Sequence, residues 1–299
     1  MSQSATDVAA VTEDAQARQQ IVQTAIEQVT HIATLPEITL RIVDVVDDPE
    51  STANDLHQII ANDPALCARV LKVVNSSFYG LPGQIGSINR AIVLLGMNAV
   101  KNIAVAASLA KLFRGGELCH AFSARDLWSH SMATAAAARL LAEKVTSNVG
   151  DEAFLAGLIH DIGIMVEMQA FRRKLVDVFD LMDDSGVNFL EAEEQVIGAN
   201  HQDFGRGLCE RWKFPKSFTF VTGYHHRPLD LAPEQRGLTS VIYVADILAA
   251  QGEFGYCGTV DRCDPDPQVL KDLGLSAADV AQVAEALPEA YEVADQLMN

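Results

Sequence analysis

The side chains of this sequence that could do chemistry are histidines and aspartates, most of them set in apolar stretches. They are Asp126, His130, His160, Asp161, His201, His225, His226 and Asp246. An ionisable side chain inside an apolar helix is costly to bury unless it is paired or bound to a metal. Imidazoles and carboxylates without thiolates suit Fe, Mn, Ni or Zn better than Ca or Cu(I). The set therefore predicts a site for a divalent transition metal.

The spacing of these residues requires several helices to build one site. Asp126 and His130 are four residues apart, so they share one face of a helix. His160 and Asp161 are adjacent, about 100° apart around a helix, and reach one centre from its two sides or from a helix end. No pair has the spacing of a zinc finger, and gaps of tens of residues separate most of them. Metal centres in helical bundles are assembled in this way.

Each of these residues alone also has an explanation without a metal. His130 could hydrogen-bond a backbone carbonyl, and Asp246 could pair with Arg125 or Arg139. The two consecutive histidines could simply be exposed. The whole set in this order is much more specific for a metal site than any single member.

Apolar residues recur with helical spacing almost throughout, with no run of alternating strands and no fixed repeat, so the predicted fold class is all-α. Asp63 before Pro64 predicts a helix start, and Ser276 with Asp279 predicts a capping box. The helix before Leu35-Pro36 should end there. The longer helices are expected over 14–33, 97–113, 126–144, 152–168, 172–183, 201–212, 239–251 and 276–287.

Gly115-Gly116 is the expected boundary between two packed helical parts. We expect an N-terminal extension over 1–29, a small helical bundle over 30–115 and a bundle with the metal site over 116–250. An acidic tail with one helix should occupy 251–299. The 299 residues are enough for one large domain or two modest ones.

The net charge of the chain limits which classes of partner it can bind. The chain has 40 acidic and 22 basic side chains and a net charge of −18, which disfavours nucleic acid and anionic membranes as partners. Residues 61–115 are the exception, with a net charge of +5 by our count of the printed sequence. They form either a solvated helix face that pairs with acidic neighbours or a surface for an acidic partner, and charge runs favour the first explanation.

The same sequence indicates a reduced, cytoplasmic protein. Its five cysteines are odd in number and have no CxxC spacing. No signal peptide is visible in residues 1–10. No stretch approaches the apolar length that a membrane span needs.

The order of the histidines and aspartates resembles the HD superfamily of metal-dependent phosphohydrolases. The surrounding sequence resembles the HDOD family, the HD-related output domain of bacterial signalling proteins, over roughly 30–250. Besides Glu194, His201 and Gly205, the stretches that carry the resemblance are LP (35–36), NDPAL (62–66), VNS (74–76), INRAI (88–92), LLG (94–96), WSH (128–130), GLIHDIG (157–163), WKFP (212–215) and HHRP (225–228). The resemblance implies an HD-type helical bundle with an N-terminal helical subdomain, and a centre of one or two metal ions.

Two departures from catalytic HD relatives bear on activity. In the cyclic-dinucleotide phosphodiesterases of the superfamily, Gly-Tyr-Pro follows the paired histidines, whereas Arg227-Pro228 follows them here. The same enzymes often have a Lys after His-Asp-Ile-Gly, and Ile164 occupies that position here. The ligand set is therefore nearly complete, but the phosphate-steadying groups are absent.

Two functions from different classes remain. The first is a regulatory module of bacterial signalling that acts through contacts with a signalling protein. The second is a metal-dependent phosphohydrolase for a nucleotide or phosphoester, in which Asp161 would bridge two metals and be the catalytic residue. The resemblance and the missing phosphate-steadying groups favour the module, and cyclic di-GMP hydrolysis is disfavoured.

Overall fold

The structure is a computed structural model that describes residues 3–29, 37–48, 50–76, 79–81, 83–110, 112–113, 117–119, 122–145 and 150–298. Within these ranges the secondary structure is helical apart from one short antiparallel hairpin, β1 (Glu117–Cys119) with β2 (Phe122–Ser123). The all-α prediction is confirmed. The expected helix end at Leu35-Pro36 and the expected boundary at Gly115-Gly116 lie outside the described residues.

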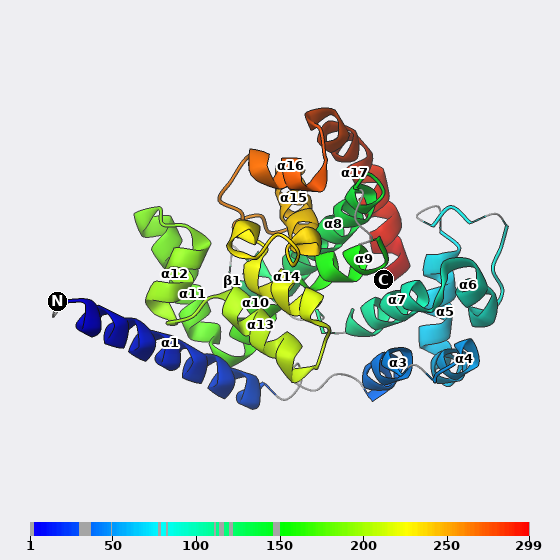
Figure 1. Ribbon diagram of the computed structural model, residues 1–299, viewed down its shortest axis with the longest axis horizontal. Helices are drawn as coiled ribbons and strands as arrows, with labels where there is room; N and C mark the ends of the chain where they lie inside the picture. The colour runs from blue at the N-terminus through cyan, green and yellow to red at the C-terminus, as the bar shows by residue number, and fades with distance from the viewer. Residues whose placement is uncertain are drawn as a thin grey trace.

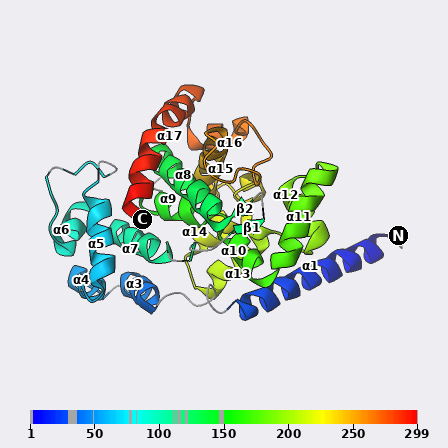
Figure 2. The same cartoon turned by 180° about the vertical axis from the view of Figure 1, so that it is seen from behind.

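The N-terminal helices form two separate groups. The long helix α1 (Gln3–Gln28) lies along the central bundle and runs out beyond it at its N-terminal end (Figures 1 and 2). Five helices form a small bundle at the opposite end of the molecule: α3 (Glu37–Asp47), α4 (Ala53–Ala61), α5 (Pro64–Val74), α6 (Ile88–Leu95) and α7 (Met97–Leu109).

Local signals fix the ends of these helices. The side chain of Asp63 accepts a hydrogen bond from Leu66 N, and Pro64 opens α5, as the sequence predicts. Gly96 separates α6 from α7 with a φ of +87°, a conformation that glycine adopts without strain. The Ser276–Asp279 capping box is also present.

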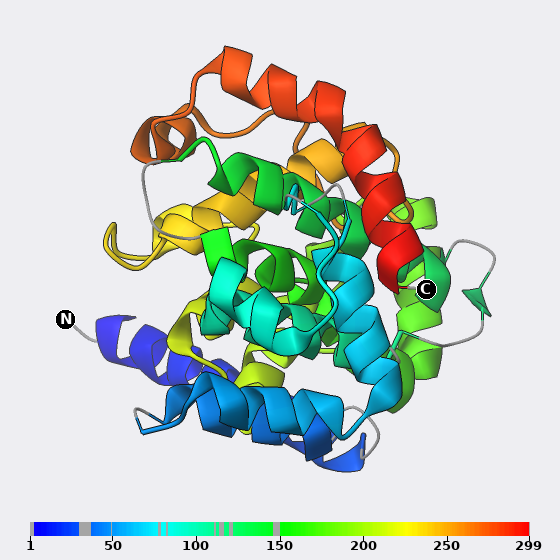
Figure 3. The ribbon, with the colours of Figure 1, turned by 90° about the vertical axis from the view of Figure 1, so that its right-hand side faces the viewer.

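The central bundle is built around α8 (Ala124–Ala142), which packs against α9 (Gly150–Ile159), α15 (Gly237–Gln251) and α17 (Ala277–Met298) (Figure 3). A second layer consists of α10 (Ile162–Ala170), α13 (His201–Arg211) and α14 (Lys216–Tyr224). The pair α11 (Arg172–Ser185) and α12 (Phe189–Val196) packs outside them. Two short helices lie in the connections between longer ones. The first, η1 (Pro228–Asp230), lies between α14 and α15, and α16 (Pro267–Leu273) lies between α15 and α17.

Small residues allow the central helices to approach closely. A Cβ atom on Gly157 of α9 would lie 2.6 Å from the Cα atom of Ala135 on α8, so only glycine fits this contact. The neighbouring alanines of α8, Ala136 to Ala138, are fully buried. Removing this surface from water contributes about 25 cal/mol per Å² of apolar area to stability. The close contact places the end of α9 beside the middle of α8.

The chain breaks its helix at the His-Asp pair. The sequence predicts one helix over 152–168, but the structure ends α9 at Ile159 and begins α10 at Ile162. His160 and Asp161 occupy the junction, which is the helix-end arrangement that two adjacent ligands require. A Cβ on Gly163, two residues further on, would collide with the backbone of His201, so α10 and α13 approach closely there.

The same region corrects one expectation about apolar length. By length and composition alone, residues Glu152–Ala170 could cross a membrane. The sequence analysis had expected no stretch of that kind. The structure buries 89% of this stretch inside the bundle, which makes it core rather than membrane span. A location in the cytoplasm stays a prediction.

Three helix boundaries also differ from the prediction. Helix α1 begins at Gln3 instead of residue 14, and α16 was not predicted. Helix α17 continues through Pro288 to Met298, beyond the expected end at residue 287. Proline costs a helix one hydrogen bond, but α17 packs on both α8 and α5, and this tertiary packing outweighs the local cost.

Candidate metal centre

Seven of the eight predicted side chains converge at the centre of the bundle. The first group is Asp161, His201, His225 and His226, and the second is His130, His160 and Asp246. Within each group, one possible ligand atom per residue lies within 4.8 Å of the others. These residues come from α8, the α9–α10 junction, α13, the end of α14 and α15. The topology therefore assembles one site from residues up to 116 positions apart.

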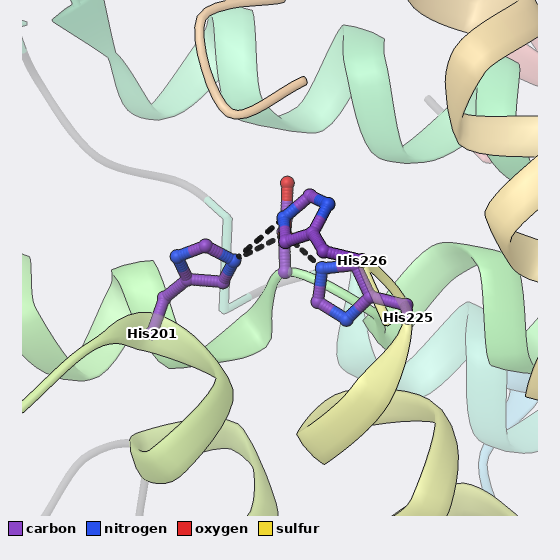
Figure 4. A group of neighbouring side chains, drawn as sticks. His201, His225 and His226 are labelled. Atoms are coloured by element: carbon purple, nitrogen blue, oxygen red, sulfur yellow. Dashed lines mark hydrogen bonds and ion pairs between the residues drawn. The ribbon is translucent and has the colours of Figure 1, made fainter. Parts of the chain in front are cut away.

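In the first group, three imidazoles lie around one carboxylate. The Nε2 atoms of His201 and His225 lie 3.4 and 3.2 Å from Oδ1 of Asp161. The Nε2 atom of His226 lies 3.1 Å from that of His201. Figure 4 shows the three rings at the end of α14 and the start of α13, with their nitrogen atoms turned toward one another.

In the second group, Asp246 is the shared carboxylate. Its Oδ1 atom lies 2.8 Å from Nε2 of His130 and 3.5 Å from Nε2 of His160. The two groups also touch each other, because Nε2 of His160 lies 3.2 Å from Oδ2 of Asp161 and Nδ1 of His226 lies 3.6 Å from Oδ2 of Asp246. The seven side chains thus form one continuous cluster with two subsites.

Hydrogen bonds donated by Nδ1–H orient three of the histidine rings. The Nδ1–H groups of His160 and His225 donate to the backbone carbonyls of Gly157 at 2.7 Å and Val221 at 3.1 Å. The Nδ1–H group of His201 donates to the carboxylate of Glu193 at 2.9 Å. A carbonyl can only accept, so when the rings of His160 and His225 are neutral, their Nε2 atoms carry the lone pairs and face the cluster. Metal-binding histidines are oriented in this way.

The unpaired atoms of the cluster fit a metal. The Nε2 atoms of His160 and His225 and both carboxylate oxygens of Asp161 are buried, and none has a hydrogen-bond partner among the described residues. The Nε2 atoms of His160 and His225 each lie 3.2 Å from an oxygen of Asp161, without hydrogen-bond geometry. Buried polar atoms are rarely left in this condition. The donor set of imidazoles and carboxylates suits Fe, Mn, Ni or Zn.

Electrostatics favours the metal-binding protonation states of Asp161, His225 and His226. Burial raises the pKa of Asp161, but His160 and His225 outweigh burial and hold this pKa well below its ordinary value. Burial and the neighbouring His225 hold the pKa of His226 well below its ordinary value. Burial also lowers the pKa of His225. An ionised carboxylate beside neutral imidazoles is the form of the site that can bind a cation.

The second subsite differs in its charge. Burial acts to lower the pKa of His130, but its hydrogen bond to Asp246 outweighs burial and raises this pKa to about 9. The Nδ1 atom of His130 has no hydrogen bond among the described residues, although the Cys257 thiol interacts with the ring and also raises the pKa. Burial acts to lower the pKa of His160 too, but Asp161 and Asp246 outweigh burial and raise this pKa well above its ordinary value. A metal at this subsite must therefore displace protons from both His130 and His160.

Asp126, the eighth candidate, is not brought into either group. Its Oδ2 atom accepts hydrogen bonds from the hydroxyl of Ser123 at 2.6 Å and from Ser123 N at 3.1 Å. Asp126 is the third residue of α8, where a carboxylate completes a capping box. Helical spacing gave Asp126 the same face as His130, but the capping geometry turns its side chain back to the helix end.

The alternative explanations without a metal do not describe these residues. His130 pairs with Asp246 instead of a carbonyl, and Asp246 pairs with histidines instead of Arg125 or Arg139. Arg139 lies beside Glu143 and over the ring of Tyr79. The paired histidines are not exposed, since the ring of the first is fully buried and that of the second is 10% exposed.

Two buried glutamates of the site escaped the sequence analysis. Glu193 contacts His201, and Glu167 on α10 interacts with Glu193 in turn. The sequence pointed to the neighbouring Glu194, but that side chain is 40% exposed and pairs with Arg18. The signal available for Glu167 was a single carboxylate inside the apolar run IGIMVEMQA.

The cluster is buried, and among the described residues its ion pairs and hydrogen bonds involve no Lys or Arg. Every side chain of the cluster is 0–2% exposed except that of His226. Ile164, at the position where HD phosphodiesterases often have a Lys, is fully buried in the core. Arg227 lies 3.6 Å from Asp230, and its side chain is 47% exposed. The described residues therefore offer no cation aimed at the cluster.

Comparison with known proteins places this geometry in a family. A family model for the HDOD domain matches residues 32–228. The match includes all of the first group but ends before Asp246, which α15 supplies to the second group. The chain belongs to the HDOD family.

Solved structures share the fold. A Geobacter sulfurreducens HDOD domain protein of unknown function is 25% identical, with a TM-score of 0.79 over 95% of this chain and 99% of that one. A Shewanella amazonensis protein named "Putative phosphohydrolase" is 22% identical, with a TM-score of 0.70 over 93% and 98%. A Marinobacter aquaeolei protein named "Putative signal transduction protein" is 22% identical, with a TM-score of 0.72 over 95% and 65%.

One curated relative extends beyond this chain. An uncharacterized protein of Treponema pallidum is 23% identical over 227 residues, which are 74% of this chain. The match spans 42% of the length of that relative.

Proposed function

We propose that this chain is a metal-binding HDOD protein that works as a regulatory module in bacterial signal transduction, through contacts with another signalling protein. The observation that carries the proposal is a buried cluster of seven side chains that could bind a metal. Seven donor side chains converge, yet only His226 has more than slight exposure. A site of this kind stabilises the fold and can transmit metal occupancy to the surface, without admitting a substrate.

The charges around the site support the same proposal. Phosphoryl transfer needs positive groups aimed at the charge that develops in the transition state. Among the described residues, the ion pairs of the cluster include no Lys or Arg. The position at which related enzymes often have a Lys is the buried Ile164. A divalent transition metal, Fe, Mn, Ni or Zn, would be held by the seven histidines and aspartates, as one ion or as two with Asp161 between them.

A metal-dependent phosphohydrolase for a nucleotide or phosphoester is the second candidate. Contact between the two donor groups favours it, because His160 lies against both Asp161 and Asp246. Divalent ions at this site would supply Lewis-acid stabilisation to a phosphoryl oxygen. In that reaction Asp161 would be the catalytic residue, and the ring of His226 would lie at the entrance.

The domain organisation of the proposal has four parts. Residues 1–29 would be an extension, 30–115 an N-terminal helical subdomain, 116–250 the bundle of the metal site, and 251–299 an acidic tail. The subdomain is the natural surface for the signalling partner, because α7 packs against α9, which ends at Ile159, the residue before His160. Metal occupancy would be communicated along this contact.

Two measurements on the full chain test the proposal. Hydrogen exchange with and without Co(II) should show slower exchange in α9 and α7 when the metal is bound. A phosphatase and phosphodiesterase screen with Mn(II) and Fe(II) should give no metal-dependent turnover. Turnover on the order of 1 s⁻¹ that disappears in Asp161→Ala would overturn the proposed regulatory function and support the phosphohydrolase instead.

A further inference from the structure

One imidazole of the metal cluster is oriented by a carboxylate rather than by a carbonyl. The Nδ1 atom of His201 lies 3.0 and 2.9 Å from the two carboxylate oxygens of Glu193. Both side chains are fully buried. Glu193 belongs to α12 and His201 opens α13, so the contact ties the pair α11–α12 to the metal site.

This contact gives His201 a different chemical character from its neighbours. A carbonyl fixes the ring orientation of His160 and of His225. A carboxylate fixes the orientation too, but its negative charge also makes the opposite nitrogen of the ring a stronger donor.

A second buried carboxyl group lies behind the first. Glu167 of α10 is 0% exposed, and neither of its oxygens has a hydrogen bond of good geometry among the described residues. Its carboxyl group nevertheless interacts with that of Glu193. Two adjacent buried carboxylates repel each other strongly unless one of them carries a proton. Burial, and then the charge of Glu193, raise the pKa of Glu167 well above its ordinary value.

We propose that Glu193 and Glu167 are positioning residues of the metal centre. Glu193 accepts the Nδ1–H of His201, and Glu167 is the buried polar group behind Glu193 that keeps its carboxyl group in place. The inference rests on the metal site of the proposed function and adds to it a relay of Glu167, Glu193 and His201 that retains the ion. The relay connects α10, α12 and α13, which are the helices around Asp161 and His201.

The test measures how fast the ion leaves. Full-length protein is stripped with a chelator and loaded with Co(II), and the release of Co(II) to EDTA is followed together with its visible absorption spectrum. Glu193→Ala should release Co(II) about 10 to 100 times faster than wild type and change the spectrum. Glu193→Gln, whose amide oxygen still accepts a hydrogen bond, should fall between the two.

Glu167 has its own pair of variants. Glu167→Gln places a permanent N–H donor beside Glu193 and should release Co(II) at nearly the wild-type rate. Glu167→Leu fills the space without a donor and should release the ion several times faster. Glu191→Gln is the matched control, because Glu191 is exposed on the same helix as Glu193 and should leave the rate unchanged.

The melting temperature of each metal-free variant shows whether it is folded. If Glu193→Ala does not fold, Glu193→Gln and the two Glu167 variants carry the test. Folded variants that release Co(II) at the wild-type rate would overturn this inference alone. Equal rates for Glu167→Gln and Glu167→Leu would remove Glu167 from the relay. A wild-type chain that binds no Co(II) would overturn the metal site itself, and with it the relay.

Discussion

The Nε2 atom of His130 lies 2.8 Å from Oδ1 of Asp246, although 116 residues separate them in the chain. The contact joins α8 to α15, which pack along each other. Asp246 lies beyond the residues that match the HDOD family model. The second subsite therefore depends on a helix outside the matched region, and its presence can be tested separately from that of the first.

We predict that His130→Ala lowers the number of bound ions without emptying the site. The variant removes one of the three donors of the second group and leaves all four donors of the first. If the wild type holds two ions per chain, the variant should hold about one, since a site with two remaining donors binds a divalent ion weakly. Elemental analysis after gel filtration measures this.

Asp126→Ala is the control for that experiment. Asp126 is four residues from His130 on the same helix, but its carboxylate caps α8. Its loss should lower the free energy of unfolding by about 1 kcal/mol and leave the metal content unchanged. An equal loss of metal from both variants would mean that the second subsite is not a separate site.

A substitution at Gly163 should disrupt the first subsite by steric overlap. The added methyl group of Gly163→Ala collides with the backbone of His201 and with Gly205 N. Pushing α10 away from α13 separates Asp161 from His201. Overpacking of this kind costs about 1–3 kcal/mol or more, and we expect a clear drop in melting temperature and weaker Co(II) binding.

Gly237→Ala provides the comparison. Gly237 is also at a helix start, but a Cβ there meets nothing within 4 Å. Stability and Co(II) affinity should stay at wild-type values or rise slightly, because alanine favours a helix. Equal effects of the two substitutions would show that the close approach of α10 and α13 does not position the site.

The fold class could be predicted from helical periodicity. The convergence of seven donors could be predicted because their order resembles that of the HD superfamily. The position of His160 and Asp161 was also constrained, since adjacent residues reach one centre only from two sides or from a helix end. Their helix was nevertheless predicted as continuous. Beside the break, Gly163 closely approaches the backbone of His201, a tertiary contact that helical periodicity does not reveal.

The residues behind the ligands could not be found in this way. Glu193 and Glu194 are neighbours with the same side chain, and only the packing of α12 decides which one is buried. Asp126 shows the opposite problem. Its spacing from His130 is right for a shared site, but its position in the first turn of α8 gives it a capping role. Local geometry therefore outweighed spacing at this residue.

We predict weak or no hydrolysis of cyclic dinucleotides. The reaction develops negative charge on phosphate oxygens, and no Lys or Arg of the described residues contacts the cluster to compensate it. The two candidates that could have folded inward point elsewhere, because Arg139 lies against Tyr79 and Arg125 is exposed.

The assay uses cyclic di-GMP and an aryl phosphodiester, with Mn(II) and Fe(II) each supplied in excess. We expect rates indistinguishable from those of Asp161→Ala. Substrate consumption near 1 s⁻¹, at the low end of ordinary enzyme rates, would contradict the prediction if Asp161→Ala abolished it.

The metal content of the purified wild-type chain, measured beside that of Asp161→Ala, tests the central claim most directly. Asp161 lies within 3.4 Å of three imidazoles and has no hydrogen bond of its own among the described residues. We predict one or two transition-metal ions per wild-type chain and a large loss of metal in the variant. Metal at 100 times its Kd should stabilise the wild type by about 2.7 kcal/mol, so its melting temperature should fall on chelation while that of the variant changes little. A wild-type chain without metal, or a variant with the same metal content, would contradict the account.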